Sequence, residues 1–243
     1  MNEIVFSAHK DYKDLQLDYP QPSKFFLPEW YKKLKHDQRK RTVKGCVPFM
    51  ETMTSGYTLK LPMDYNLIFN KKGQDNKLYS CVGTAVELEG FLEKHQDKDT
   101  NLVSASRHDS LQIEGSSYYE KMKGLDVPKI MNPWIINTPK GYSCLFLPPL
   151  NNPAQDYFSI IPGIVNTDKF EQHINFPIIY NSDKYSEIDK IIKRGTPYVQ
   201  VIPFKRESWK MTIKTKQKNS NYMWPLQFLN NYRDRIWNKI KWI

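Results

Sequence analysis

The chain has 243 residues, of which 40% are hydrophobic and 14% aromatic. This content excludes wholesale disorder, because enough apolar surface is available to offset the entropy lost on ordering. No apolar run reaches 18 residues and the first residues lack the apolar core of a signal peptide, so we expect a cytoplasmic protein without a membrane span. The formal net charge of +10 favours anionic partners, such as nucleotides, nucleic acid or an acidic protein.

The cysteines and histidines do not have the spacing of a metal or redox site. The cysteines lie far apart and form no CxxC pair, so we expect reduced core thiols at Cys46, Cys81 and Cys144. The five histidines include no HxH or HxxxH pair, and no P-loop or GxSxG motif is present. The sequence therefore predicts no metal site and no cofactor.

Residues 1–45 form a Pro-rich segment that ends in a short basic helix. The spacing of Trp30, Tyr31 and Leu34 predicts a surface helix whose aromatic side chains pack on the body. The run KHDQRKR follows at residues 35–41. A solvated face is the favoured interpretation of this run, and contact with a polyanion is the alternative.

Residues 46–213 are predicted to form the body. Its first part reads as strands over 57–61 and 65–69, then a turn, then a strand over 78–88. The region at about 70–130 has little periodicity beyond that strand, and we interpret it as an irregular insertion.

The second half of the body reads as a series of short strands. The predicted strands lie within residues 132–151 (two strands), 157–168, 173–180 and, after a loop, 193–204. Pro and Gly corners recur at a spacing of about ten residues, which is typical of an all-β sandwich, barrel or jelly roll. We expect Gly141, Gly163 and Gly195 at corners where a side chain would be strained.

Residues 214–243 are predicted to be a polar linker followed by an amphipathic helix from Met223. The apolar positions recur at steps of three and four: Leu226, Leu229, Tyr232, Ile236, Ile240 and Ile243. We expect this stripe to dock on the body or on a neighbouring subunit. A membrane surface and a nucleic acid are the alternatives for its basic side.

Four segments, taken in order, look like the ordered motifs of the trimeric dUTPase and dCTP-deaminase superfamily. They are SGYTLKLP at 55–62, TPKGYSCLFLPPLN at 138–151, IIPGIVNTDKF at 160–170 and KRGTPYVQVIPF at 193–204. The resemblance implies a mainly β, dUTPase-like β-clip or jelly-roll-like barrel, here with an N-terminal elaboration and a C-terminal helix. It also implies a nucleotide ligand and a homo-oligomer, with a trimer favoured.

Two blocks carry a second resemblance. NPWIINTPKGYS and GTPYVQVIPFKRE look like blocks in bacterial and tailed-phage proteins that have no assigned activity. This resemblance implies a protein of phage type, which would act in the host cytoplasm.

The chain departs from the dUTPase pattern where that family carries its chemistry. Asn166 stands at the position of the Asp that activates water, and an amide cannot act as a general base. Asp168 follows two residues later, in a predicted turn. The phosphate-binding Arg-Ser-Gly turn is replaced by Pro149, Leu150 and Asn151, which offer no cation or hydroxyl.

Five residues are the candidates for ligand binding by this resemblance: Tyr57, Asn151, Asn166, Asp168 and Gln200. Gln200 keeps a polar role implied near a ligand phosphate. Tyr57 has the ring to stack on a base, although packing is the more common role for a Tyr in a β core. For catalysis the candidates are Asp168 and His108, the latter oriented by Asp109, with solvent exposure as the more usual state of such a histidine.

These observations support three functions. We favour a non-catalytic protein with the dUTPase fold that serves as a binding or structural component. The alternative is a nucleotide-processing enzyme, a hydrolase or deaminase, with its general base displaced to Asp168 or His108. The third is a basic nucleic-acid-binding protein that uses residues 32–44 and the tail helix.

Overall fold

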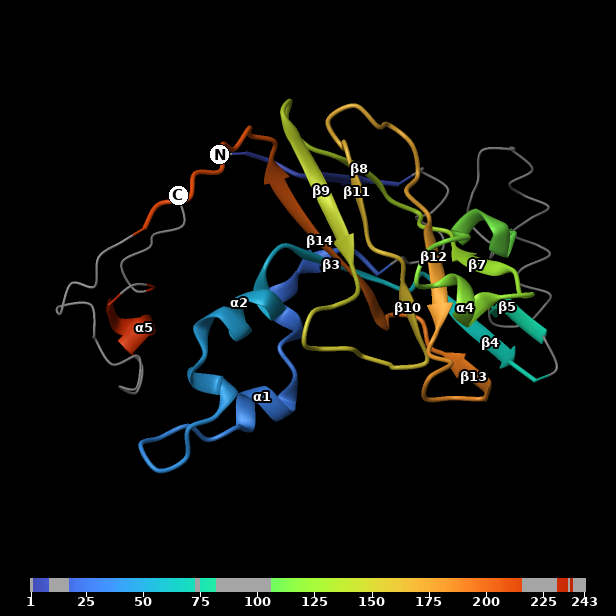
Figure 1. Cartoon of the computed structure of the whole chain (residues 1–243), viewed down its shortest axis with the longest axis horizontal. Coiled ribbons are helices and arrows are strands. Elements are labelled where there is room, and N and C mark those ends of the chain that lie inside the picture. Colours follow the sequence, from blue (N-terminus) through green and yellow to red (C-terminus); the bar gives the residue numbers. More distant parts are fainter. Residues whose placement is uncertain are drawn as a thin grey trace.

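The structure is a computed structural model that describes residues 2–8, 18–72, 75–81, 106–215, 231–235 and 237. Strands dominate this part of the chain and form four antiparallel sheets, with a few short helices on both sides of them (Figure 1). The predicted mainly β class is therefore confirmed. The strands of the described part form open sheets and do not close into one barrel.

The five-stranded sheet carries most of the residues discussed below. Its order is β11 (Gly163–Val165), β9 (Tyr142–Leu147), β14 (Pro197–Lys205), β3 (Tyr57–Lys60) and β2 (Gln21–Pro22). Two glycines provide the corners that precede its central strands: Gly141 has φ +88° before β9, and Gly195 has φ +79° before β14. Glycine is favoured at such angles because it has no Cβ to clash.

The three other sheets complete the body. The four-stranded sheet has the order β10 (Phe158–Ile160), β12 (Phe176–Tyr180), β7 (Val127–Ile130) and β6 (Ser106–His108). The three-stranded sheet has the order β13 (Glu187–Ile192), β4 (Asp64–Asn70) and β5 (Asp75–Cys81), and β1 (Val5–Ser7) pairs with β8 (Ile135–Asn137). Strand β4 alternates buried and half-buried residues, as a strand with one face on the core must.

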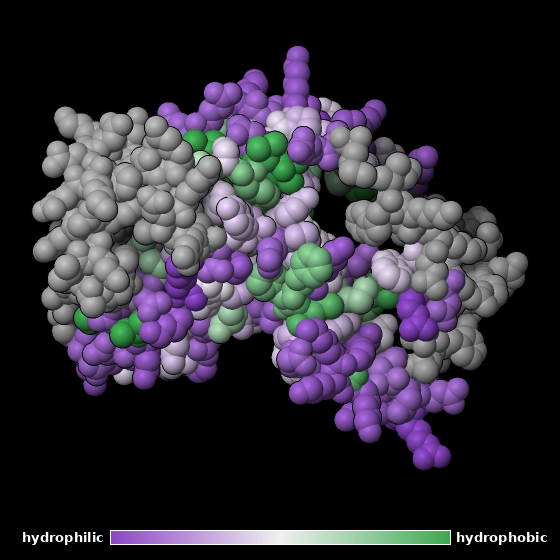
Figure 2. Space-filling model, turned by 180° about the vertical axis from the view of Figure 1, so that it is seen from behind, coloured by the Kyte–Doolittle hydropathy of each residue, from purple (hydrophilic) through white to green (hydrophobic). Residues whose placement is uncertain are grey.

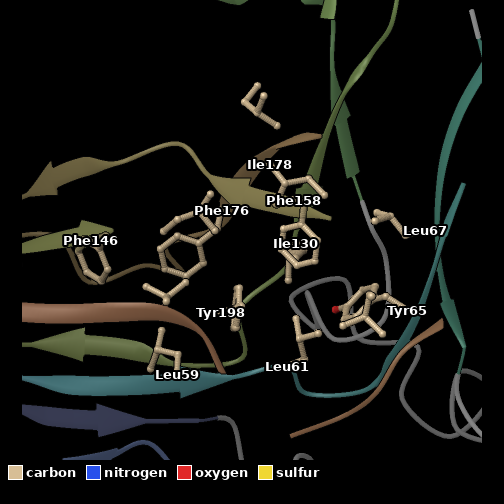
Figure 3. Packing of buried hydrophobic residues seen from close by; sticks show 14 of the residues in the cluster. Leu59, Leu61, Tyr65, Leu67, Ile130, Phe146, Phe158, Phe176, Ile178 and Tyr198 are labelled. Carbon is tan, nitrogen blue, oxygen red and sulfur yellow. The ribbon is translucent and has the colours of Figure 1, made fainter. Parts of the chain in front are cut away.

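The core is one cluster of apolar side chains to which the three larger sheets contribute. Figure 3 shows Leu59 and Phe146 of the five-stranded sheet near Phe176 of the four-stranded sheet. The ring centroids of Phe146 and Phe176 are 5.5 Å apart, and those of Phe176 and Tyr198 are 5.7 Å apart. These contacts pack the two sheets against each other, which fixes the position of β9 and β14.

The helices are short. They are η2 (Ser23–Phe26), α1 (Glu29–Lys33), η3 (Val43–Gly45), α2 (Val47–Thr54), η4 (Ser110–Ile113), α4 (Tyr119–Met122) and α5 (Asn231–Arg235). Helix α1 is the predicted N-terminal surface helix. Its Tyr31 is buried and stacks on Phe49 of α2, whereas Trp30 remains half exposed. None of the described helices is long and apolar enough to cross a membrane.

Several predictions about local structure need correction. Residues 187–192, assigned to a loop, form β13, because Ile188 and Ile192 point into the core between exposed charged residues. Gly163 is not at a strained corner: it lies in β11 without a positive φ, and a Cβ there would meet no atom within 4 Å. Cys46 is exposed and not a core thiol, whereas Cys144 is buried as expected.

Other predictions are tested only in part. The region from 106 to 130, interpreted as irregular, contains β6, β7, η4 and α4. The strand predicted over 78–88 is β5 as far as Cys81, and the rest of it lies outside the described residues. Most of the predicted tail helix also lies outside them, including Leu226, Leu229, Ile236, Ile240 and Ile243.

Candidate functional site

The six predicted site residues lie at three separate places in the structure. Asn166 and Asp168 follow β11, where β9 begins and β14 ends. Tyr57, Asn151 and Gln200 lie towards the other end of β9, since Gln200 pairs with Leu147 and neighbours Thr58. His108 lies in β6, in a different sheet. The three strands β9, β11 and β14 can be followed side by side in Figure 1.

Arg206, which the sequence did not indicate as a site residue, connects the residues at the first of these places through its hydrogen bonds. It follows β14 directly, and its Nη1 donates to the Tyr142 carbonyl at 2.6 Å and to Ser143 Oγ at 2.8 Å. The same nitrogen donates to Asp168 Oδ1 at 2.9 Å, while Nη2 donates to Asp168 Oδ2. We call Ser143, Asn166, Asp168 and Arg206 the Arg206 cluster. Its two-pronged ion pair is the geometry in which guanidinium binds carboxylate best.

Asp168 is held as a carboxylate of low basicity. Its side chain is 2% exposed, and its Oδ2 also accepts the Gly141 N–H at 2.9 Å. The hydrogen bonds from Arg206 and then from the Gly141 N–H lower the pKa of Asp168 to about 2. An efficient general base needs a pKa near the working pH, so Asp168 is poorly suited to take a proton from water in this arrangement.

Asn166 is bound into the same cluster. Its Oδ1 accepts a hydrogen bond from Ser143 Oγ at 2.8 Å, and Ser143 is fully buried. The neighbouring Thr167 is also buried, and its hydroxyl lies 2.7 Å from that of Thr138. Side-chain hydrogen bonds therefore tie the turn after β11 to Ser143 of β9 and to Thr138 in the segment between β8 and β9.

Gln200 organises the second place. It is 2% exposed on the central strand β14, where a buried amide must find partners for its polar atoms. Its Oε1 accepts the Leu150 N–H at 3.0 Å, and its Nε2 donates to the carbonyls of Thr52 at 2.8 Å and Ser55 at 2.7 Å. We call Gln200 with these three residues the Gln200 cluster. It connects α2, the loop after β9 and strand β14.

Asn151 and Tyr57 lie beside the Gln200 cluster. Asn151 has φ 55°, a left-handed conformation that Asn tolerates better than most residues, and its Nδ2 donates to Thr52 Oγ1 at 2.8 Å. Tyr57 is half-buried, with its ring centroid 5.5 Å from that of Phe6. In the turn at 149–151, the structure thus places hydrogen bonds within the chain where the resemblance implies a phosphate.

His108 is not oriented by Asp109. The Asp109 carboxylate accepts the Leu111 N–H at 2.8 Å and so caps the short helix η4. Burial, and then the charge of Lys129, lower the pKa of His108, so its imidazole is neutral at physiological pH. Within the described residues, no three His, Cys, Asp or Glu side chains gather in a way that could hold a metal ion.

Comparison with known proteins gives little beyond these observations. No protein-family model matches the chain, and no curated protein matches its sequence. Among solved structures, the chain is similar to a point mutant of the dUTPase of Staphylococcus bacteriophage 80alpha with dUpNHpp. The TM-score is 0.37 at 8% sequence identity, with 90% of this chain and 92% of that chain covered. A match this loose carries no argument about the site.

Proposed function

We propose that the protein is a non-catalytic binding or structural component, built on a dUTPase-like β body and assembled from several copies of the chain. The observation that carries the first part is the state of Asp168. It is the one carboxylate of the predicted site, and Arg206 with the Gly141 N–H holds it at a pKa of about 2. An enzyme with Asp168 as its general base would need this side chain to leave Arg206 before it could activate water.

Turnover assays test the lack of catalysis. Purified protein with magnesium and dUTP or dCTP should produce no more product than the Asp168→Ala variant under the same conditions. Asn166→Asp should not create activity either, because the turn at 149–151 still lacks a cation for the phosphates. Turnover by the unaltered chain that Asp168→Ala abolishes would establish the enzyme alternative.

Self-association is supported by residues 207–214, which we call the exposed arm. The arm is extended and runs away from the sheets at the end of β14 (Figure 1). Its apolar residues alternate with polar ones, and Trp209, Met211 and Ile213 are 88%, 84% and 86% exposed. Leaving three such side chains in water forgoes about 1.5 to 3 kcal/mol for each that could be buried.

A second copy of the chain offers a surface for this arm. On the outer face of the five-stranded sheet, Ile164, Leu145 and Ile202 are direct cross-strand neighbours, and Ile164 is 63% exposed. Direct neighbours lie on the same face of a sheet, so these residues form one apolar row. Apolar patches within a hydrophilic surface are also visible on the face shown in Figure 2. Each copy therefore carries both an apolar arm and an apolar row. In a symmetric assembly the arm of one copy would be buried on the row of another copy.

Sedimentation at several protein concentrations tests the assembly. The full chain should sediment as an oligomer, with a trimer expected from the resemblance, and the variant Trp209→Ser, Met211→Ser, Ile213→Ser should sediment as a monomer. Lys210→Ser with Lys214→Ser changes the alternate positions of the same arm and should leave the oligomer intact. A full chain that is monomeric throughout would end the self-association proposal.

Nucleic-acid binding is the third candidate function, and it is favoured by the basic run 35–41, which lies in an exposed turn. Asp37 accepts the backbone N–H groups of Arg39 and Lys40 there, which holds the turn closed. Binding through this turn would weaken steeply as salt rises, since bound cations are released from the nucleic acid. Affinity for a DNA duplex at two salt concentrations distinguishes this function from the first.

A further inference from the structure

A cavity of about 430 Å³ lies between the N-terminal helices and the C-terminal segment. Helices α1 and α2 and residues 43–45 provide one side, while Arg233 and Trp237 provide the other. We propose that this cavity binds a small aromatic anion of the size of a nucleoside monophosphate. The site contains none of the residues on which the proposed binding or structural role rests, so either proposal can fail without the other.

The walls of the cavity suit a flat apolar group. Tyr31 is 4% exposed, and its ring is held in place by stacking on Phe49 with the centroids 6.2 Å apart. Leu34, Val47 and Met50 extend the apolar wall beside it. Apolar and aromatic walls with a few placed polar groups are typical of small-molecule sites, and 430 Å³ lies within their usual range of about 300 to 1,000 Å³.

Trp237 is fixed in position by a hydrogen bond to the body. Its Nε1 donates to Glu51 Oε1 of α2 at 2.7 Å. Because a buried or half-buried indole N–H has few alternative partners, this bond orients the ring. Trp237 thus contributes an aromatic surface to the cavity, and its hydrogen bond to Glu51 connects residues that are 186 positions apart in the chain.

The charged groups in the cavity wall are cationic. Lys44 and Arg233 line the cavity, and the lining residues include no carboxylate. Lys44 Nζ donates to the Lys32 carbonyl at 2.5 Å, and Arg233 donates to Asp234 through Nε at 2.9 Å. An ammonium has three donors and a guanidinium five, so each of these bonds uses only one of them. An ammonium and a guanidinium beside an apolar wall favour a ligand with an anionic group attached to an aromatic one.

His36 and Gly45 set the size of the cavity. His36 Nδ1 accepts the Thr42 N–H at 2.9 Å, which fixes the orientation of the ring. The ring edge lies against Gly45 so closely that a Cβ at Gly45 would come within 2.2 Å of it. Gly45 has no positive φ, so Gly45→Ala is permitted by the backbone and must instead displace the His36 ring.

Calorimetric titration of the full chain with four probes tests the site: uridine 5′-monophosphate, adenosine 5′-monophosphate, uridine and inorganic phosphate. We expect at least one monophosphate to bind roughly tenfold or more tightly than uridine or phosphate alone, because both the ring and the charge contribute. Absence of binding by both monophosphates would overturn the proposal. Equal affinity for phosphate alone would overturn the aromatic part of it.

Three variants and one control variant locate the binding. Lys44→Met and Arg233→Met should each weaken the monophosphate roughly tenfold or more, as expected for a lost charge-assisted hydrogen bond. Lys190→Met removes an exposed charge on β13 that does not line the cavity and should have no effect. Gly45→Ala keeps every charge and should still weaken binding, because the displaced His36 ring changes the cavity. Unchanged affinity in Lys44→Met, Arg233→Met and Gly45→Ala would overturn the proposal.

Discussion

The Gln200 cluster and the Arg206 cluster lie at the two ends of the pairing between β9 and β14, and they hold distant parts of the chain together by different chemistry. Gln200 is neutral and 2% exposed, and its hydrogen bonds go to backbone groups. Arg206 is 34% exposed and charged, and its main partner is the buried carboxylate of Asp168. Loss of a partner in the first cluster leaves buried groups unsatisfied. In the second cluster water reaches the Arg206 guanidinium, and the ion pair weakens when the Asp168 carboxylate is protonated.

The hydrogen bonding of the two clusters is also relevant to function. Both clusters occupy positions at which the dUTPase resemblance implies ligand contacts. In both, the polar atoms are bound to other parts of the same chain. Polar residues that are hydrogen-bonded within the chain stabilise it there, so we expect partners to bind at other surfaces.

The largest effect should come from Gly56, beside the Gln200 cluster, and Gly141, beside the Arg206 cluster, provides the comparison. A Cβ at Gly56, next to the Gln200 cluster, would lie 2.0 Å from the Val201 carbonyl oxygen, and Gly56 has φ +68°. Gly56→Ala should therefore cost about 3 kcal/mol or more in the free energy of unfolding, measured by urea denaturation. Gly141→Ala, next to the Arg206 cluster, meets no atom within 4 Å and should cost only about 1 kcal/mol through its positive φ.

Gly163→Ala serves as the control for this series. It has neither a positive φ nor a close neighbour, and its free energy of unfolding should stay within about 0.5 kcal/mol of the parent. Equal losses at Gly56 and Gly141 would show that the close approach to β14 does not matter.

The next largest effect should follow from the complete burial of Gln200 compared with the partial exposure of Arg206. Gln200→Leu should destabilise by about 2 to 3 kcal/mol, because the Leu150 N–H and the carbonyls of Thr52 and Ser55 lose their partner. Gln172→Leu alters an exposed glutamine and should be nearly neutral. Thermal or urea unfolding of both variants measures the difference. A neutral Gln200→Leu would mean that water replaces the lost amide.

The smallest effect concerns the pH dependence of the Arg206 cluster. The folded pKa of Asp168, about 2, lies below its ordinary value of 3.8. Its contribution to stability is therefore fully present above about pH 4 and is lost as the pH falls through 2. Since Arg206 is partly exposed, water screens the pair and keeps this contribution modest.

A paired measurement isolates Asp168 from the other carboxylates. Asp168→Asn does not titrate, so the stability difference between the parent and this variant should shrink as the pH falls from 5 to 2. Asp64 and Asp156, whose pKa values are also lowered by their lysine partners, titrate in both proteins and cancel. A difference that is constant over this range would show that Arg206 does not hold the carboxylate.

Much of the strand pattern could be read from local sequence, and the failures have specific causes. Strands β3, β4, β9 and β14 lie where alternation and Pro or Gly corners predict them. Strand β13 was missed because its exposed edge carries Glu187, Asp189 and Lys190, which resemble a loop when only Ile188 and Ile192 point inwards. Arg206 was missed because the charged residues around it look like a solvated strand end.

The sequence by itself determined the β class, the corners at Gly141 and Gly195, and the amide in place of a carboxylate at Asn166, because these depend on a residue and its immediate neighbours. The tertiary structure decided what the polar residues do. Asp168 is hydrogen-bonded to Arg206, which is 38 residues away in the chain, and Gln200 is hydrogen-bonded to Thr52, which is 148 residues away. Hydrogen bonds of this kind depend on sheet register and on the packing of α2. Contacts between distant segments do not change the local order of residues, so hydrophobic periodicity cannot reveal them.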